Sequence, residues 1–340
     1  TLRDGSASNN SNRWETWQNW APYGVPGPED YAQISNGDTV VINTPLTIRG
    51  FRLTNGVLAS AAGSSLTTTH DSTWTGGWIS GEWTNPAGAS VIASGPEHKY
   101  FSNGAVMNNA GLLEWQGGGS LISQGLGSAP VTINNQPGGI LRISGSGNLF
   151  TVQSASILPI FNNLTGGRIE KTVSTGVAYW YYWTLNNDSD IFINNGELYP
   201  FANTVHFRTA SALMGSGTFR LNTNFYLHTD LFATARTEFI GGFLSCTENA
   251  ERTWSGPGVL NWSSGTIYGR LTRPSGTATT LSGTDEKELY DGAELINEGT
   301  VTWTGNGNIR GRSVNSPGAV IRNRGTFLAD TPADIVTLSG

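Results

Sequence analysis

The sequence predicts an all-β chain folded as a single elongated parallel β-helix, and three observations lead to that prediction. Two long stretches are similar in sequence, and an Asn–turn–Gly signature recurs at a similar spacing. The short segments between these signatures alternate between apolar and polar residues. Alternation of this kind indicates strands with one buried face, and helical periodicity is almost absent. We expect roughly ten to twelve coils wound in the right-handed sense.

Residues 74–122 align with residues 262–310 without a gap, at a constant offset of 188 positions. Over the 49 aligned positions there are 17 identities, mostly Gly, Trp, Asn and Pro, as at Trp74 and Trp262. Self-similarity at a fixed offset is the signature of repeat architecture. We therefore expect an internal repeat with this period of 188.

The recurring signature places an asparagine before a glycine-containing turn. Successive asparagines are separated by 26, 28 and 32 positions in one series and by 26 positions in a second, at Asn109, Asn135, Asn163 and Asn195, and at Asn297 and Asn323. A coil of ~26 residues holds three short strands at ~3.3 Å per residue. Asn and Gly suit the corner because both tolerate positive φ, and asparagines at equivalent corners could stack into a ladder.

The N-terminal segment, residues 1–37, differs from the rest and is expected to form an arm and an aromatic cap, with the β-helix over residues 38–340. Trp14, Trp17 and Trp20 precede a cluster of prolines that excludes a continuing helix or a central strand. We expect these rings to cover the open end of the stacked core. A sugar-binding platform is the alternative interpretation.

Composition excludes several classes of partner. The net charge is −6 with only three lysines, whereas a nucleic-acid partner requires a basic surface, and no apolar run is long enough to span a membrane. The single cysteine, Cys246, excludes an intrachain disulfide and a cysteine-based zinc site and is expected to be a small buried side chain. No cofactor or metal motif is present.

The densest aromatic run, residues 179–183, is the main candidate for a binding site. Alternation along a strand would place Tyr179, Tyr181 and Trp183 on one face and Trp180 and Tyr182 on the other. A coil interior cannot easily hold five large rings, so we expect one set outside, where it could stack on a glycan. Packing beneath a loop or another subunit is equally compatible with the run.

Polar groups follow the aromatic run at Asp188 and Asp190, and they would supply hydrogen bonds to sugar hydroxyls. Catalysis of hydrolysis needs paired carboxylates. The candidate groups for catalysis are Asp188 with Asp190, His228 with Asp230, and Glu238 with Arg236. None forms a recognisable motif, so we assign no catalytic residue.

Stretches such as WTGGWISG, NNAGLLEWQGGGSLI and INEGTVTWTGNGNI resemble the Gly-, Thr- and Asn-rich repeats of very large bacterial surface and secreted proteins. These are β-helical, adhesin-like chains similar in style to filamentous haemagglutinin repeats. The resemblance covers most of residues 14–330 and is specific for architecture rather than activity. It implies a location outside the cell or on its surface.

From these observations we expect a structural role as a filament subunit, a stalk or an adhesin segment cut from a larger repeat protein. Open coil ends are unpaired strand edges, which need a cap or a partner. Because the C-terminal end carries no cap-like sequence, we expect it to meet further repeats or another copy of the chain. The alternative is a carbohydrate-active β-helix, either an enzyme or a polysaccharide-binding module.

Overall fold

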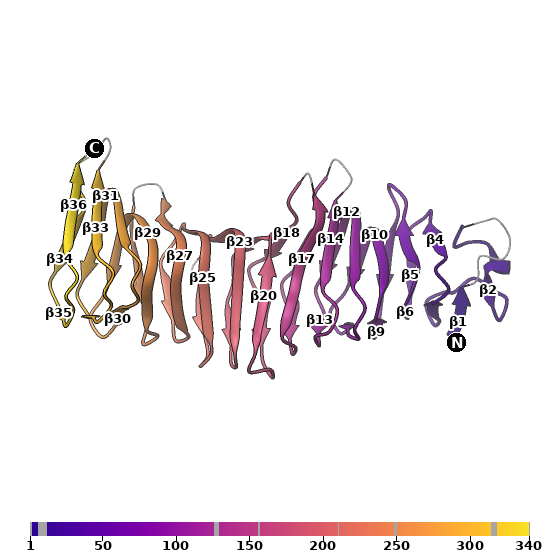
Figure 1. The fold of residues 1–340 in the computed structure, drawn as a ribbon. Coiled ribbons are helices and arrows are strands. Elements are labelled where there is room, and N and C mark those ends of the chain that lie inside the picture. The colour runs from indigo at the N-terminus through magenta and orange to yellow at the C-terminus, as the bar shows by residue number, and fades with distance from the viewer. Residues whose placement is uncertain are drawn as a thin grey trace. The chain divides into compact units, whose positions relative to one another are not determined.

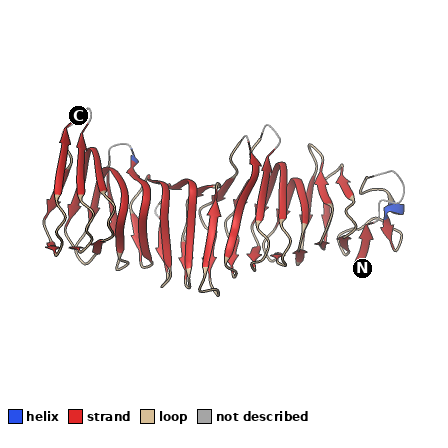
Figure 2. Cartoon of the chain, in the orientation of Figure 1, coloured by secondary structure: helices blue, strands red, loops and turns tan. Residues whose placement is uncertain are grey.

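A computed structural model describes residues 2–5, 12–125, 129–155, 157–209, 211–247, 250–313 and 318–339. Residue 1 and residues 6–11 of the expected N-terminal arm lie outside the described residues. The chain is an all-β parallel β-solenoid of about 13 turns, which confirms the predicted fold class with slightly more coils than expected. The described part contains no α-helix, and the blue segment near the N-terminus in Figure 2 is a single turn of 3₁₀ helix. The coils group into two compact units, Thr1–Thr184 and Leu185–Gly340, which are described in turn.

The first unit is built from short strands and one turn of 3₁₀ helix (Figure 1). Its elements are β1 (Leu2–Gly5), η1 (Trp17–Asn19), β2 (Trp20–Ala21), β3 (Tyr31–Ile34), β4 (Thr39–Ile42), β5 (Leu46–Ile48), β6 (Gly50–Leu53), β7 (Val57–Ser60), β8 (Ser65–Thr68), β9 (Ser72–Trp74), β10 (Gly77–Asn85), β11 (Ser90–Ala93), β12 (Lys99–Asn109), β13 (Leu112–Trp115), β14 (Leu121–Gly125), β15 (Thr132–Asn135), β16 (Ile140–Ile143), β17 (Gly147–Ala155), β18 (Ile160–Asn163), β19 (Arg168–Lys171) and β20 (Val177–Tyr181).

The second unit contains longer strands that bend around the coil corners. Its strands are β21 (Thr184–Asn187), which begins at the unit boundary, β22 (Ile191–Ile193), β23 (Glu197–Phe207), β24 (Ser211–Met214), β25 (Thr218–Leu227), β26 (Leu231–Ala233), β27 (Arg236–Cys246), β28 (Glu251–Ser255), β29 (Leu260–Arg273), β30 (Ala278–Leu281), β31 (Lys287–Asn297), β32 (Thr300–Trp303), β33 (Ile309–Ser313), β34 (Val320–Asn323), β35 (Thr326–Ala329) and β36 (Ile335–Ser339).

Strands pair in parallel with the equivalent strands of the next coil. In the first unit β11, β13 and β16 follow one another in this way, as do β12, β15 and β18. The burial pattern of β15 alternates, with Ile133 and Asn135 inside. Because a single coil cannot bury its apolar side alone, the stacking of coils creates the core.

Ladders of asparagine run through the interior of the first unit. Asn85, Asn109, Asn135 and Asn163 are each the last residue of their strand, and all are buried. The Nδ2 of each of the first three donates to the Oδ1 of the next, at 2.7, 2.8 and 2.8 Å. The same Nδ2 atoms also donate to main-chain carbonyls across the corner. The predicted ladder is therefore present, and it begins one coil earlier than the signature suggested.

The second unit repeats this device with a change. Asn297, the last residue of β31, donates to Asn323 Oδ1 at 2.7 Å. Opposite Asn297 in the register lies Arg273, which is fully buried and donates to the Trp254 and Ala278 carbonyl oxygens at 2.7 and 3.0 Å. Burial lowers the pKa of Arg273 to about 10. An arginine thus takes the ladder position at the corner of this coil.

Asn195 was expected to continue the first series, and the structure places it elsewhere. It lies in the turn after β22, where its Oδ1 accepts a hydrogen bond from the Gly196 N–H at 3.1 Å. The buried asparagine at the end of a strand in this region is Asn187, the last residue of β21.

The N-terminal segment covers the first coil. Strand β1 pairs with β3, and Asn12 and Trp14 exchange main-chain hydrogen bonds with Val41 of β4 at 2.6 and 2.8 Å. The rings of Trp14 and Trp20 are buried, with centroids 4.5 Å apart, whereas Trp17 is 50% exposed. Two of the three predicted cap residues are therefore buried, and the third is exposed.

The last described coil has no such cover among the described residues. Ile335 of β36 stands opposite Ile309 of β33 in the register, and the two are 58% and 1% exposed. Phe327 likewise stands opposite the buried Val301 and is itself partly exposed. Phe327, Ala329 and Ile335 continue the buried positions of Val301, Trp303 and Ile309, and these three side chains form an exposed apolar surface, called here the terminal coil face.

Candidate functional sites

The aromatic run at 179–183 divides between the core and the surface. Strand β20 ends at Tyr181, and Tyr182 has a positive φ of 62°, which breaks the alternation. Trp183 therefore turns inward and is buried like Trp180, although simple alternation placed it with Tyr179. The two tryptophans pack on Phe150, at centroid distances of 4.6 Å for Trp183 and 4.4 Å for Trp180, so their rings are not available to a ligand.

The surface part of the run consists of three tyrosines. The rings of Tyr179 and Tyr181 are parallel within 7°, with centroids 5.4 Å apart, and Tyr182 is 45% exposed beside them. Asp188 and Asp190, which the sequence grouped with this run, belong to the second unit.

The candidate acidic residues make bonds that join neighbouring coils. Asp190 accepts a hydrogen bond from the Ala212 N–H at 2.9 Å, and Asp230 accepts one from the Thr253 N–H at 2.8 Å. Glu238 pairs with Arg236 and accepts a bond from Asn261 Nδ2 at 2.7 Å. These three carboxylates stabilise main chain or side chains of adjacent coils.

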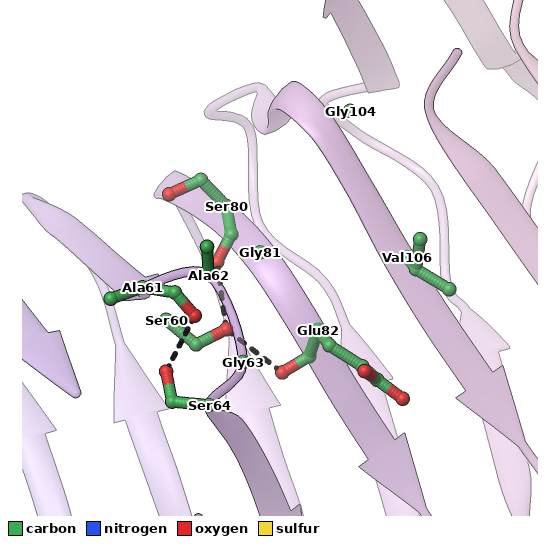
Figure 3. A pocket seen from close by; sticks show the side chains of 10 residues that line it. All are labelled: Ser60, Ala61, Ala62, Gly63, Ser64, Ser80, Gly81, Glu82, Gly104 and Val106. Carbon is green, nitrogen blue, oxygen red and sulfur yellow. Dashed lines mark hydrogen bonds between the residues drawn. The ribbon is translucent and has the colours of Figure 1, made fainter. Parts of the chain in front are cut away.

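A hollow of about 440 Å³ opens where β10 bulges (Figure 3). Gly81 has a φ of 78° at the bulge, and a Cβ there would overlap the Ser60 carbonyl oxygen. The Ser60 hydroxyl donates to the Glu82 carbonyl oxygen at 3.0 Å. Glu82 is the one carboxylate among the lining residues, and it accepts a bond from Asn108 Nδ2 at 3.1 Å. Small side chains with a single acid do not supply the two groups that glycoside hydrolysis requires.

A row of aromatic rings runs along the outside of the second unit. One register position carries an aromatic ring on four coils, at His206, Tyr226, Tyr268 and Tyr290. Phe243 lies diagonally between Tyr226 and Tyr268. Successive centroid distances are 4.9, 5.5, 5.4 and 5.0 Å, for His206–Tyr226, Tyr226–Phe243, Phe243–Tyr268 and Tyr268–Tyr290. The sequence did not reveal this row because its members lie on separate strands, and only the register between coils brings them together.

His206 sits at one end of this row in a crowded position. Its Nδ1 lies 3.0 Å from His228 Nε2. Burial, with the positive charge of Arg208 and the neighbouring His228, lowers the pKa of His206 to about 4. His206 is therefore neutral at physiological pH, and one of the two facing nitrogens carries the shared proton.

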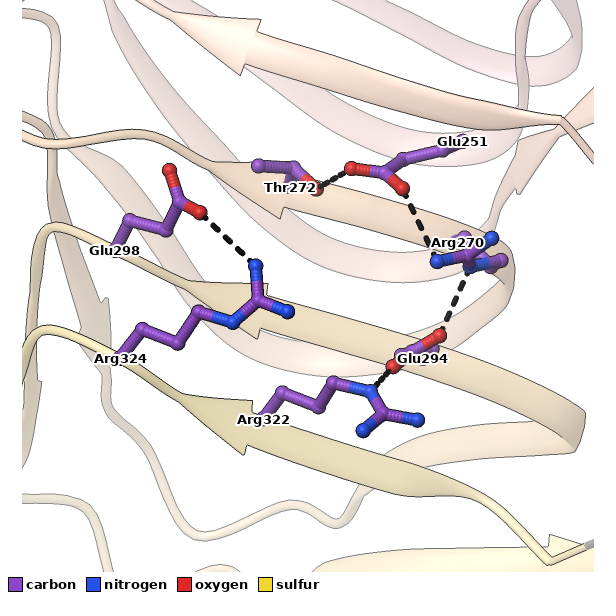
Figure 4. A network of polar contacts seen from close by, with 7 residues as sticks. All are labelled: Glu251, Arg270, Thr272, Glu294, Glu298, Arg322 and Arg324. Atoms are coloured by element: carbon purple, nitrogen blue, oxygen red, sulfur yellow. Dashed lines mark hydrogen bonds and ion pairs between the residues drawn. The ribbon is translucent and has the colours of Figure 1, made fainter.

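Ion pairs join four successive coils of the second unit (Figure 4). Arg270 on β29 contacts Glu251 at 3.1 Å and Glu294 at 2.8 Å, and Glu294 also pairs with Arg322 on β34. A further pair joins Arg324 to Glu298 at 3.4 Å. Glu294 is buried, whereas Arg270 and Arg322 are about half exposed, so solvent screens these pairs and each contributes little individually.

All three lysines of the chain are fully buried. The Nζ of Lys99 donates to the Gly95 carbonyl oxygen at 3.0 Å, that of Lys171 to the Ser174 carbonyl oxygen at 2.9 Å, and that of Lys287 to the Asp285 carbonyl oxygen at 2.9 Å. Burial lowers the pKa of Lys99 to about 8. These amines stabilise the carbonyl groups of coil corners.

Two further features of the described residues bear on function. Cys246 is buried, as expected, and burial raises the pKa of its thiol to about 12. No three potential metal ligands come together among the side chains that the structure describes, and no described helix is long and apolar enough to cross a membrane.

In comparisons with known proteins, no family model, no curated protein and no solved structure matches the chain.

Proposed function

We propose that this chain is a structural segment of an extracellular or cell-surface repeat protein, acting as a stalk, filament subunit or adhesin segment whose last coil stacks end to end on further repeats or on another copy. The observation that carries the proposal is the terminal coil face. Its three side chains, Phe327, Ala329 and Ile335, are apolar, and the positions that they continue are buried one coil earlier.

The strand edges of this coil strengthen the argument. Strands β34, β35 and β36 each pair with the preceding coil on one side. The described residues place no strand against their other edges, which present main-chain N–H and C=O groups together with apolar side chains. Such an edge is the surface that another β-solenoid coil pairs with. A further coil, from additional repeats or from a second copy, would supply both hydrogen bonds and apolar cover.

The side chains that could serve chemistry instead support a scaffold. Buried amides, amines and one guanidinium bond to coil corners, and carboxylates such as those of Asp190 and Asp230 hold the next coil. Such interactions repeat along the stack and strengthen each coil-to-coil interface, which suits a load-bearing role.

The proposal is tested by sedimentation velocity and negative-stain electron microscopy of the purified chain over a concentration series. We expect assemblies that grow with concentration and are joined at coil ends. A chain that sediments as a monomer at every concentration, with isolated particles in the images, would contradict self-association.

A further inference from the structure

A second surface hollow in the first unit, of about 360 Å³, combines aromatic rings with polar groups. Thr54 and Asn55 line it from one coil, Trp78 from the next, and Glu97, His98 and Tyr100 from the coil after that. Aromatic rings with a few convergent polar groups in a concave surface are the usual features of a small-ligand site.

The two large rings of the hollow form a rigid pair. Trp78 on β10 stands opposite Tyr100 on β12, and their rings lie parallel within 13° at a centroid distance of 4.0 Å. Both side chains are partly exposed. The pair therefore presents two aromatic rings together at the surface of the hollow.

His98 completes the aromatic wall and is held in one orientation. Its ring meets Tyr100 nearly edge-on, at 79° and 6.2 Å. Its Nδ1 accepts a hydrogen bond from the Ser120 N–H at 3.1 Å. In the neutral imidazole the proton then resides on Nε2, so His98 offers a donor to a ligand while the Glu97 carboxylate offers acceptors.

The chain itself shows that the fold does not require this aromatic pair. Gly77 and Lys99 are paired in the register, as are the identical residues found 188 positions later, Gly265 and Lys287. Beside them, however, the counterparts of Trp78 and Tyr100 are Thr266 and Glu288. The Thr266 hydroxyl donates to Glu288 at 3.0 Å. The paired glycine and lysine are thus common to both copies of the repeat, whereas the two aromatic rings occur only in the copy that contains Trp78 and Tyr100.

We propose that this hollow binds a neutral sugar of an oligosaccharide. The ring C–H groups of a pyranose carry partial positive charge and pack on the electron-rich faces of Trp and Tyr. Its hydroxyl groups can both donate and accept, which matches the amide of Asn55, the hydroxyl of Thr54, the imidazole of His98 and the carboxylate of Glu97. The exposed Glu97 charge opposes acidic sugars, which selects a neutral one.

The test is calorimetric titration of the intact chain with cellohexaose, laminarihexaose and xylohexaose, with oligogalacturonate as the acidic comparison. The informative variant is Trp78→Thr with Tyr100→Glu, because the chain already accommodates that pair at Thr266 and Glu288. We expect at least one neutral oligosaccharide to bind. We expect the double variant to weaken it about tenfold or more, with an unchanged melting temperature.

The matched control is Tyr179→Ser with Tyr181→Ser, which removes the other parallel ring pair of the first unit and should leave the affinity unchanged. Three results would overturn the proposal. The first is that no neutral oligosaccharide binds, and the second is that oligogalacturonate binds more tightly than the neutral oligosaccharides. The third is that binding is lost in the Tyr179 and Tyr181 variant but not in the Trp78 and Tyr100 variant.

Discussion

At the scale of single residues, the fold depends on polar side chains placed where a core usually holds apolar ones. An asparagine within the ladder bonds to two neighbours and a corner carbonyl at once, as Asn135 does with Asn109, Asn163 and the Arg168 carbonyl oxygen. Removing one amide leaves its buried partners without hydrogen bonds, which costs more than the bond itself contributes. The ladder is therefore sensitive to every one of its members.

Asn135→Ala should lower the free energy of unfolding by about 3 kcal/mol, because it orphans buried groups on both sides. The control is Asn134→Ala, its immediate neighbour. Asn134 belongs to an outer ladder with Asn108 and Asn162 that is only partly buried. Urea titration followed by circular dichroism measures both, and equal losses would contradict a special role for the inner ladder.

Lys99 provides a pH test of burial. Its pKa is about 8 in the folded chain against an ordinary value of 10.5, so between these values the unfolded chain binds the extra proton. Stability contributed by this group must therefore rise as pH increases from about 8 to 10.5. The native chain should gain stability relative to Lys99→Met across that window in urea titrations. A difference between the two that does not change with pH would contradict a buried amine.

Several of these residue positions could be predicted from sequence, and the exceptions have physical causes. The Asn–Gly signature identified Asn109, Asn135 and Asn163 because a corner limits which residues fit. It misplaced Asn195, since an asparagine in a local turn has the same sequence pattern as one that ends a strand. Alternation failed at Trp183 because one positive φ at Tyr182 reverses the direction in which the next side chain points.

At the scale of the element, the coil corner is the unit that the chain reuses. Lys99 donates to the Gly95 carbonyl oxygen, and Trp115 Nε1 donates to the Gly119 carbonyl oxygen at 3.0 Å. Glycine is required at 119 because a Cβ there would overlap the Glu97 carbonyl oxygen of the preceding coil. Close approach of two main chains, rather than an unusual φ, explains this glycine.

Gly119→Ala should therefore destabilise the chain by about 3 kcal/mol or more, since the obstructing atom belongs to the main chain and cannot rotate away. Gly27→Ala is the control, because no atom lies within 4 Å of the Cβ that it would add. Thermal unfolding compares the two variants. A melting temperature for Gly119→Ala that equals the native value would show that the corner can widen.

The elements also show why the candidate sites were harder to predict than the fold. Strand periodicity is local and can be recognised within a short segment. The pairing of Trp78 with Tyr100, or of Tyr226 with Tyr268, depends on which strands meet across coils and in what register. The sequence favoured the aromatic run at 179–183 because its rings are adjacent along the chain, yet two of them are in the core.

At the scale of the whole molecule, the first and last described coils differ. Strand β1 and the main chain at Trp14 pair with the first coil, whereas the described residues leave the terminal coil face uncovered. In β proteins, association is favoured when it buries apolar surface and pairs open strand edges. We therefore propose that end-to-end stacking occurs through the terminal coil face.

Sedimentation velocity of two charge variants beside the native chain tests this association most directly. Ile335 and Leu328 are similarly exposed, at 58% and 55%, but Ile335 continues the buried position of Ile309 while Leu328 continues the outer position of Thr302. Ile335→Lys should abolish concentration-dependent association, because a charge at the joint would be buried without a partner, and Leu328→Lys should leave it intact. Association that survives Ile335→Lys, or that is lost equally in both variants, would contradict stacking through the terminal coil face.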